Sequence, residues 1–169
     1  MLYGSGLLIV GEQGRGKTRL TWHIASLLAG LGLEIVAVDL APDVAGVGKP
    51  LPPIPGARVL RPQRLRAPRL ESRGDCRLAW KLARHNAEQT SSVLERAAVE
   101  PGDVLVINDA TIHLHSGSLG LLLKAVSSHK ASVVNAYLGG SLGVGCGIAA
   151  REARMVAILG EVLGRVWRV

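Results

Sequence analysis

Gly11-Glu12-Gln13-Gly14-Arg15-Gly16-Lys17-Thr18 is the most informative stretch of this sequence. It matches the pattern G-x-x-x-x-G-K-[ST], in which glycines let consecutive backbone N–H groups turn towards a polyphosphate. The helix that follows such a loop presents its positive end to the same anion. We therefore expect the loop and the residue after it to bind a nucleoside triphosphate through Gly11, Gln13, Gly14, Arg15, Gly16, Lys17, Thr18 and Arg19.

The residues on either side of this loop support the same interpretation. Leu7–Val10 is a short apolar run of the kind that forms a buried strand, and apolar residues recur at helical spacing between Leu20 and Leu31. Strand, loop and helix thus occur in the order that phosphate binding requires. In this arrangement Lys17 would reach the β- and γ-phosphates, and the Thr18 hydroxyl would be a ligand of Mg²⁺.

A second β-favouring run, 33–40, includes Asp39 near its end. A helix that joins two such runs is typical of a parallel sheet, whose ligands gather at the carboxyl ends of the strands. We therefore expect Asp39 near the loop, as a catalytic carboxylate that positions a water molecule or an acceptor hydroxyl. A helix cap or a loop carboxylate is the alternative for this residue.

A third apolar run, Val104–Asn108, is followed at once by Asp109. An acid at the end of such a strand binds Mg²⁺ directly or through water in proteins with this type of loop, so we expect Asp109 to be both a catalytic residue and a magnesium ligand. Thr111, just beyond it, could orient an attacking water or an acceptor. His113 and His115 follow, and no third metal ligand accompanies them.

The remaining periodic segments predict an α/β fold. Its expected form is a three-layer fold around a mostly parallel sheet of about five strands, with helices on both faces, in a single domain spanning residues 1–169. Asn135 lies near the end of the fourth strand, where it could contact the base of a bound nucleotide or form a turn. The further elements are expected at 75–99 (helix), 118–128 (helix), 132–138 (strand), 148–165 (helix) and 166–169 (strand).

The segment 41–75 is different, because seven of the eight prolines fall in it and no helical or alternating period survives. Ten basic residues and only two acidic ones occur between positions 49 and 84. We interpret 41–75 as a Pro/Arg-rich insertion. The arginines at 58–84 could meet a phosphorylated, nucleic-acid or acidic protein partner, or they could form a solvated basic linker.

Two features bear on the cellular compartment. Cys76 and Cys146 are far apart and belong to no metal-binding spacing, so we expect neither a disulfide framework nor a zinc site, and a reducing cytoplasm fits best. The stretch 131–150 carries no charge, yet its glycines and Asn135 fit a strand followed by a mobile glycine-rich connection better than a membrane span.

Together, Gly11–Thr18 and Val104–Asp109 make the chain resemble the P-loop NTPase superfamily, as its Walker A and Walker B motifs. The segment Asp39–Asp43 is similar to a strand-end segment of the SIMIBI class, in which an asparagine at the position of Asn135 contacts adenine. Glu12 stands where MinD/ParA-type members carry a signature lysine, which argues against that subfamily. Residues 135–138 lack the lysine and aspartate of the guanine-reading element, so the resemblance implies ATP rather than GTP.

Three functions agree with these observations. The first is a Mg²⁺-dependent ATPase that uses Lys17, Asp39 and Asp109. The second is an ATP-dependent kinase whose acceptor, a small molecule or a polynucleotide, is held by the basic insertion, since arginines offer bidentate contacts to anions. The third is a nucleotide-gated module that docks on nucleic acid or on an acidic protein.

Overall fold

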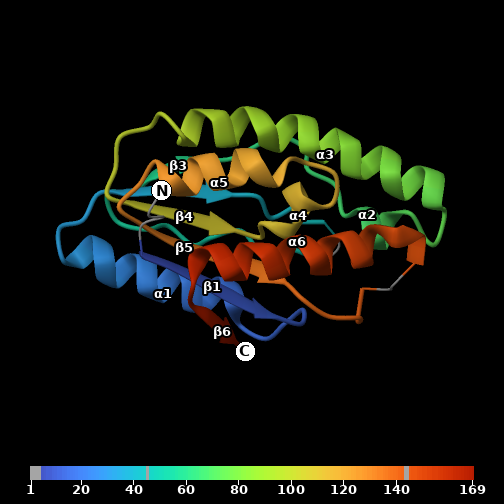
Figure 1. Ribbon diagram of the computed structural model, residues 1–169, viewed down its shortest axis with the longest axis horizontal. Helices are drawn as coiled ribbons and strands as arrows, with labels where there is room; N and C mark the ends of the chain where they lie inside the picture. The colour runs from blue at the N-terminus through green and yellow to red at the C-terminus, as the bar shows by residue number, and fades with distance from the viewer. Residues whose placement is uncertain (1–4, 45, 143–144) are drawn as a thin grey trace.

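The fold is organised around one sheet in which all strand pairings are parallel (Figure 1). The computed structural model describes residues 5–44, 46–142 and 145–169. Within them the strands are β1 (Ser5–Gly11), β2 (Ile35–Asp39), β3 (Arg58–Leu60), β4 (Val104–Asn108), β5 (Ala131–Tyr137) and β6 (Val166–Arg168). Their order across the sheet is β3-β2-β4-β5-β1-β6. β5 therefore separates β4 from β1, the strand that leads into the predicted phosphate-binding loop Gly11–Thr18, called the phosphate loop below.

Helices cover both faces of the sheet, which confirms the expected three-layer α/β architecture (Figure 1). The helices are α1 (Lys17–Gly30), α2 (Pro68–Glu71), α3 (Cys76–Ala97), α4 (Thr111–Leu114), α5 (Leu119–Ser127) and α6 (Ile148–Leu163), with a short 3-10 turn, η1 (Gly145–Gly147), before α6. One apolar cluster joins the sheet to α1, and the other joins it to α3, α4, α5 and α6. The carboxyl ends of β1, β4 and β5 point towards the side where α2 lies (Figure 1).

Local sequence explains why the main elements form. Every residue of β2 and β4 is buried, as expected for central strands of a parallel sheet that are covered on both faces. At the start of α3, the Asp75 carboxylate accepts a hydrogen bond from the Leu78 N–H at 3.1 Å, which satisfies one of the free donors of the first turn. Gly164 ends α6 in the left-handed conformation that favours glycine.

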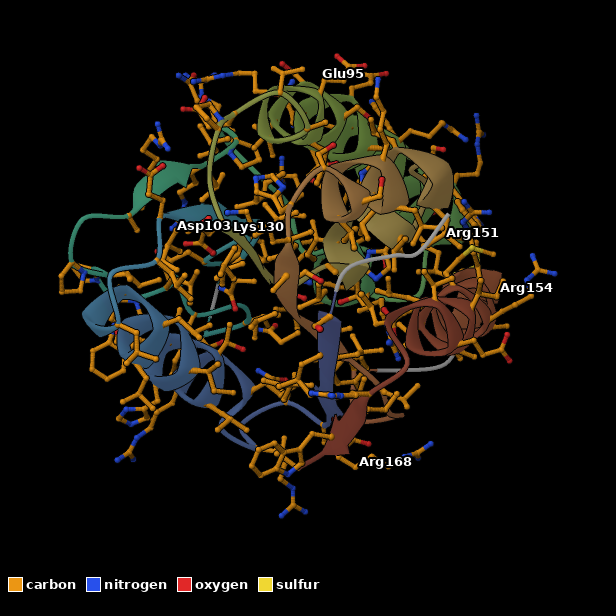
Figure 2. The ribbon with its side chains drawn as sticks, turned by 60° about the vertical axis from the view of Figure 1, so that its left-hand side comes forward. Glu95, Asp103, Lys130, Arg151, Arg154 and Arg168 are labelled. Carbon is orange, nitrogen blue, oxygen red and sulfur yellow. A yellow bond between two sulfur atoms is a disulfide. The ribbon has the colours of Figure 1, made fainter. Side chains whose placement is uncertain are left out.

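The amino ends of the central strands are joined by an ion pair. Lys130 Nζ lies 2.7 Å from Asp103 Oδ1, just before β5 and β4 respectively, and Figure 2 shows the two side chains together. The other Asp103 oxygen accepts from the Glu34 N–H at 3.0 Å. These contacts link the amino ends of β2, β4 and β5, at the end of the strands opposite the glycine loop Gly11–Thr18.

The segment 41–75 contains more regular secondary structure than was predicted. It contains β3, which extends the sheet by pairing in parallel with β2, and the single-turn helix α2. The sheet therefore has six strands among the described residues rather than about five. A three-residue strand and a four-residue helix are too short to show a periodic pattern, so neither could be predicted from periodicity.

The buried face of α1 also differs from the prediction. Leu27 and Leu31 are 71% and 78% exposed, whereas Thr21 and Ala25 are fully buried. The helix packs closely on the sheet through small side chains, and part of the apolar stripe that suggested the helix points away from the core.

The expectation that the two cysteines stay unpaired is wrong. Cys76, the first residue of α3, forms a disulfide with Cys146 in η1, across a separation of 70 residues. Tertiary structure alone brings them together, and their spacing could not show it. The prediction of a reducing compartment, which depended on unpaired thiols, therefore loses its premise.

The uncharged stretch 131–150, weighed above as a membrane span, contains a strand and the start of a helix. Residues 131–137 of the uncharged stretch 131–150 form β5, as expected for a strand, and Ile148 begins α6. Among the described residues, no helix combines the length and the apolar character needed to cross a bilayer. Gly143 and Val144, in the glycine-rich connection, lie outside the described residues.

Candidate functional site

The phosphate loop has the backbone that its sequence predicts. Gly14 and Gly16 adopt φ values of 77° and 85°, which only glycine takes without strain, and α1 begins immediately afterwards at Lys17. The Lys17 ammonium donates to the carbonyls of Gly11, at 2.9 Å, and Glu12, at 2.7 Å. Burial lowers the Lys17 pKa, and the nearby Asp109, Glu12 and Glu152 carboxylates oppose that shift. The loop therefore holds a partly buried cation against its own carbonyl groups.

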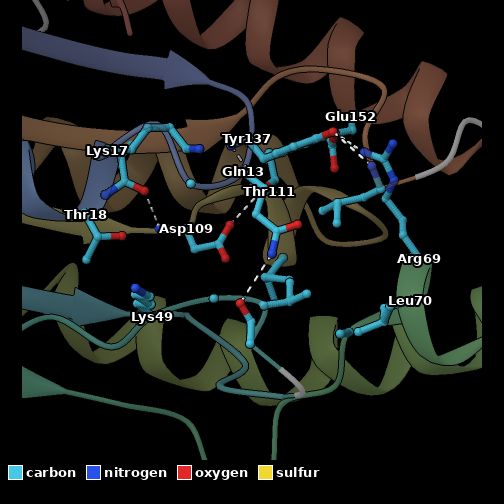
Figure 3. Close-up of a pocket in the computed structure, with 18 of the residues that line it drawn as sticks. Gln13, Lys17, Thr18, Lys49, Arg69, Leu70, Asp109, Thr111, Tyr137 and Glu152 are labelled. Carbon is cyan, nitrogen blue, oxygen red and sulfur yellow. Dashed lines mark hydrogen bonds and ion pairs between the residues drawn. The ribbon is translucent and has the colours of Figure 1, made fainter.

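A cavity of about 490 Å³ opens from this loop (Figure 3). Its walls include most of the residues predicted to bind the nucleotide, namely Gln13, Gly14, Gly16, Lys17, Thr18, Arg19, Asp109 and Asn135. Gly11, Arg15 and Asp39 are not part of its lining. The cavity also extends well beyond the loop, to residues of α2, α4 and α6 that the sequence did not suggest.

Asn108 is the residue that faces Thr18. The Thr18 hydroxyl donates to Asn108 Oδ1 at 3.2 Å, so the last residue of β4 reaches the phosphate loop, and the acid after it does not make this contact. The Asn108 amide nitrogen donates to Asp39 Oδ1 at 2.8 Å and to the Lys49 carbonyl at 3.0 Å. Asn108 is thus fixed in an orientation that keeps its oxygen towards Thr18.

Asp39 lies one layer behind the cavity wall. Its carboxylate is 3% exposed and pairs with Arg61 at 2.7 Å, and it accepts from the N–H groups of Ala41 and Leu51. Through its contact with Asn108 it supports the Thr18 position indirectly. A direct catalytic role for Asp39 stays a prediction, and these contacts favour a positioning role.

Asn135 occupies the centre of the same network. Its amide nitrogen donates to Thr21 Oγ1 at 2.9 Å and to Asn108 Oδ1 at 2.8 Å, and its oxygen accepts from the Asp109 N–H at 2.8 Å. The residue is 1% exposed. Contact with a nucleotide base stays a prediction, and it would require these hydrogen bonds to be exchanged.

Asp109 is held in an unusual backbone conformation at the cavity wall. Its φ of 59° is uncommon for a residue other than glycine, and such conformations cluster at functional sites. The Thr111 hydroxyl donates to Asp109 Oδ1 at 2.8 Å, as Figure 3 shows. Burial raises the Asp109 pKa, while Thr111, His115 and Lys17 act in the opposite direction. The Asp109 carboxylate therefore borders the cavity with one oxygen already hydrogen-bonded.

A buried ionic cluster closes the far end of the cavity. Arg69, from α2, pairs with Glu152, from α6, at 2.8 Å, and the other Glu152 oxygen lies 2.7 Å from His115 Nε2. Each of the three side chains is at most 6% exposed. Figure 3 shows Arg69 and Glu152 together on the wall opposite Lys17. Tyr137 lies between the two ends, with Lys17 Nζ and the Arg69 guanidinium 5.6 and 4.9 Å from its ring centre.

The neighbouring helix α4 is fixed from two sides. The Arg151 guanidinium, labelled on α6 in Figure 2, donates to the carbonyls of Leu114, at 3.2 Å, and Gly117, at 2.9 Å. His113 has Nδ1 2.7 Å from the Thr90 hydroxyl and Nε2 3.0 Å from the Ser118 carbonyl. His113 and His115 therefore have separate partners, and no group of three or more metal-ligating side chains occurs among the described residues.

Glu12 connects the phosphate loop to the glycine-rich connection after β5. Its carboxylate accepts hydrogen bonds from Ser141, from the Gly140 N–H at 3.0 Å and from the Tyr137 hydroxyl at 3.0 Å. These donors, Ser141 first, lower the Glu12 pKa to about 2. A Cβ atom on Gly139 would meet this carboxylate, which would have to move to make room for it. The start of the connection, at Gly140 and Ser141, is thus anchored at Glu12.

Sequence reasoning missed Asn108, Arg69 and Glu152. Asn108 was missed because the acid directly after the strand, Asp109, was predicted to be the magnesium ligand. Alternation along β4 offered no guide, since the whole strand is buried. Arg69 was one basic residue among ten, and Glu152 lies on a helix 83 residues away. A buried acid on an apolar helix face, such as Glu152 on α6, was the one signal available.

Comparison with known proteins supports the fold. No family model matches the chain, and no curated protein sequence matches it. Among solved structures, the flagellar accessory protein FlaH from Methanocaldococcus jannaschii is similar, with a TM-score of 0.52 and 10% sequence identity. The similarity covers 99% of this chain and 72% of that chain. The chain therefore has a fold similar to that of a distant solved protein, and its specific activity has to be inferred from the site.

Proposed function

We propose that this chain is a Mg²⁺-dependent ATP-binding domain that acts on the γ-phosphate of ATP. The observation that carries the proposal is the phosphate loop, with left-handed Gly14 and Gly16, a following helix, and a partly buried Lys17. Among the described residues, the Lys17 ammonium donates only to carbonyl oxygens of its own loop, which a phosphate could replace. Such preorganised donors stabilise the charge that develops during phosphoryl transfer.

The residues at this site fit a magnesium ion. Thr18 would be its ligand, as expected, and Asn108 Oδ1, which accepts from the Thr18 hydroxyl and the Asn135 amide, would join it by exchanging those hydrogen bonds. Hydroxyl and amide oxygens are suitable ligands for Mg²⁺, which usually keeps several waters. The ion would supply charge neutralisation for the phosphates. This assignment leaves the Asp109 carboxylate available to the reacting group.

ATP is proposed over GTP because residues 135–138 lack the guanine-reading pattern. The likeness to the SIMIBI class, carried by Asp39–Asp43 and by the position of Asn135, belongs to the same proposal. A cytoplasmic location is not part of it, because the Cys76–Cys146 disulfide removes the premise of that expectation.

Calorimetry with MgATP tests the proposal directly. The wild-type chain should bind MgATP and release phosphate, and Lys17→Ala should weaken binding and reduce turnover about 10²–10³-fold, the effect of removing one key transition-state donor. Lys124→Ala, which removes an exposed lysine on α5, is the matched control and should behave as the wild type. Equal turnover in Lys17→Ala and Lys124→Ala would overturn the assignment.

Transfer to an acceptor is favoured over simple hydrolysis by the shape of the cavity. A water molecule needs little room, whereas the cavity continues past Asp109 to Arg69, His115 and Glu152. Clefts and cavities of several hundred cubic ångströms are typical of small-molecule sites. The kinase hypothesis therefore gains support, although four basic residues of the insertion, Arg58, Arg61, Arg66 and Arg69, already have carboxylate partners.

Docking on nucleic acid or an acidic protein is the third candidate, and a basic surface favours it. Arg77, Lys81 and Arg84 are exposed at helical spacing on α3 and make no ion pair with another described residue. If these three cations met the phosphates of single-stranded DNA, affinity would fall roughly 20-fold between 50 and 200 mM salt. Binding of Arg77→Glu/Lys81→Glu to single-stranded DNA, measured against Arg168→Glu, tests this, and equal, salt-independent binding would exclude it.

A further inference from the structure

The far end of the cavity is built differently from the phosphate loop. It is formed by side chains from α2, α4 and α6, with the Arg69–Glu152–His115 cluster on one wall and the apolar side chains of Leu70 and Ile112 nearby. Leu142, from the connection anchored at Glu12, completes the lining. A ligand there would therefore meet a buried polar cluster on one side and apolar surface on the other.

Charge decides which ligands fit this end. The guanidinium of Arg69 is matched by the Glu152 carboxylate at 2.8 Å, and Asp109 adds a second negative charge at the boundary. Three cations of the cavity lining, Lys17, Arg19 and Lys49, have no carboxylate partner within the described part of the chain. They lie at the nucleotide end, the end formed by the glycine loop, where a triphosphate would meet them. An anionic acceptor would face two carboxylates with no excess positive charge, and burying a charge without compensation is costly.

Hydrogen-bonding capacity at this end is small but specific. His115 is buried and lines the cavity, and its Nδ1 atom has no hydrogen-bond partner among the described residues. Buried polar atoms of this kind are rare in native structures, and a catalytic role or a bound water or ion can account for one. Thr111 Oγ1 occupies one Asp109 oxygen, and the other oxygen accepts no hydrogen bond within the described part of the chain. A hydroxyl group suits both positions, since it can donate and accept.

We propose that the far end of the cavity binds a neutral, partly apolar small molecule with a hydroxyl group, and that this hydroxyl accepts the γ-phosphoryl group of ATP. The proposal rests on the ATP-binding function above and names its acceptor class. A bond forms between the acceptor oxygen and the γ-phosphorus, and the bond from that phosphorus to the β–γ bridging oxygen breaks. The hydroxyl proton passes to the Asp109 carboxylate, and the electron pair of the broken bond leaves with ADP.

Binding can be tested without turnover. Thermal unfolding and calorimetry would be run in the presence of a saturating non-hydrolysable ATP analogue, with uridine, adenosine, glycerol and myo-inositol as neutral probes. UMP, AMP, glycerol 3-phosphate and myo-inositol 1-phosphate are their anionic counterparts. We expect at least one neutral probe to bind at least tenfold more tightly than its phosphorylated counterpart. Tighter binding of the phosphorylated probes, or binding of none, would overturn the proposal.

A variant locates the bound probe. Leu70 is 40% exposed on α2, so Leu70→Trp can fill part of the far end with little demand on the core. It should weaken the neutral probe at least ten times more than it weakens the ATP analogue. Leu31→Trp, at a 78% exposed position directly after α1, is the control for the same change of side chain. Equal affinity of the probe for wild type and Leu70→Trp would place the ligand elsewhere and overturn the proposal.

Transfer is then followed with ATP labelled at the γ-phosphate. The bound neutral probe should become labelled by the wild-type chain. Label appearing only as inorganic phosphate would reject the acceptor proposal and leave ATP binding intact. Absence of ATP binding by the wild-type chain would instead be a failure of the proposed function, so the two failures are distinguishable.

Discussion

The two ends of the cavity differ in how the chain builds them. The end proposed to bind the nucleotide is lined mainly by residues from one contiguous stretch, Gln13–Arg19, and backbone groups and a helix end define it. The far end is assembled from single side chains, Arg69, His115 and Glu152, that lie on three separate elements. The first end can form wherever strand, loop and helix occur in order. The second exists only when the whole domain is packed, so its ligand preference depends on long-range contacts.

The largest expected effect comes from removing the acid at the centre of the far end. Glu152→Ala leaves the buried Arg69 and His115 without their shared carboxylate. Breaking a buried ion pair from one side costs about 3–5 kcal/mol, so the free energy of unfolding in urea should fall by that amount. Glu161→Ala, at an exposed position on the same helix, should change it by less than about 0.5 kcal/mol. A small effect of Glu152→Ala would mean that the far end does not depend on this cluster.

The disulfide tests the same dependence on long-range links. It joins the start of α3 to η1, directly before α6, which carries Glu152. Closing a loop of 70 residues stabilises a fold by about 2–4 kcal/mol, chiefly through the unfolded chain. Reduction, or the double variant Cys76→Ser/Cys146→Ser, should lower the free energy of unfolding by that amount. Reductant should have no effect on the double variant, and an effect there would point to another cause.

Asp109 lies between the two ends of the cavity, and replacing it distinguishes an effect on turnover from an effect on MgATP binding. Asp109→Asn should reduce turnover about 10²-fold, equivalent to about 2.7 kcal/mol, if the carboxylate accepts a proton. The affinity for MgATP should change far less, because Asn108 and Thr18 lie on the nucleotide side. Turnover of the wild type should also rise with pH through the raised Asp109 pKa, since a base must be ionised, and the variant should lose this limb.

Calorimetric titration of MgATP beside steady-state kinetics distinguishes this role from metal binding. Asn108→Ala is the matched comparison and should alter the magnesium dependence more than the pH profile. If Asp109→Asn instead weakens MgATP binding as much as it slows turnover, the original assignment of Asp109 as the magnesium ligand holds.

The contrast between the two ends also explains what could be predicted. A motif of eight consecutive residues predicted the strand, glycine loop and helix that border one end of the cavity, and apolar runs predicted the central strands β2, β4 and β5. The pairing of Arg69 with Glu152 joins positions 83 residues apart, and the disulfide joins positions 70 apart, so neither leaves a local pattern. Asn108 shows a finer limit. Which of two adjacent residues faces Thr18 depends on how β4 ends, and the positive φ of Asp109 turns that carboxylate towards the cavity.

The smallest expected effect concerns His113, which supports α4 beneath the far end. Burial lowers the His113 pKa below its ordinary value of 6.5, so the folded chain keeps the neutral ring. Below pH 6.5 the unfolded chain therefore binds this proton more readily than the folded one, and stability falls as the pH decreases. For one group the loss between pH 6.5 and 5.5 is at most about 1.4 kcal/mol.

His113→Gln can still donate to the Ser118 carbonyl, 3.0 Å from the ring nitrogen, but cannot take up a proton. Its free energy of unfolding should therefore vary less with pH over this range than that of the wild type, as measured by urea denaturation at each pH. Parallel profiles would show that the acid sensitivity originates elsewhere. Binding of the neutral probe at pH 5.5 can be compared in the same two proteins. If His113→Gln kept this binding while the wild type lost it, α4 would be the element through which low pH weakens binding at the far end.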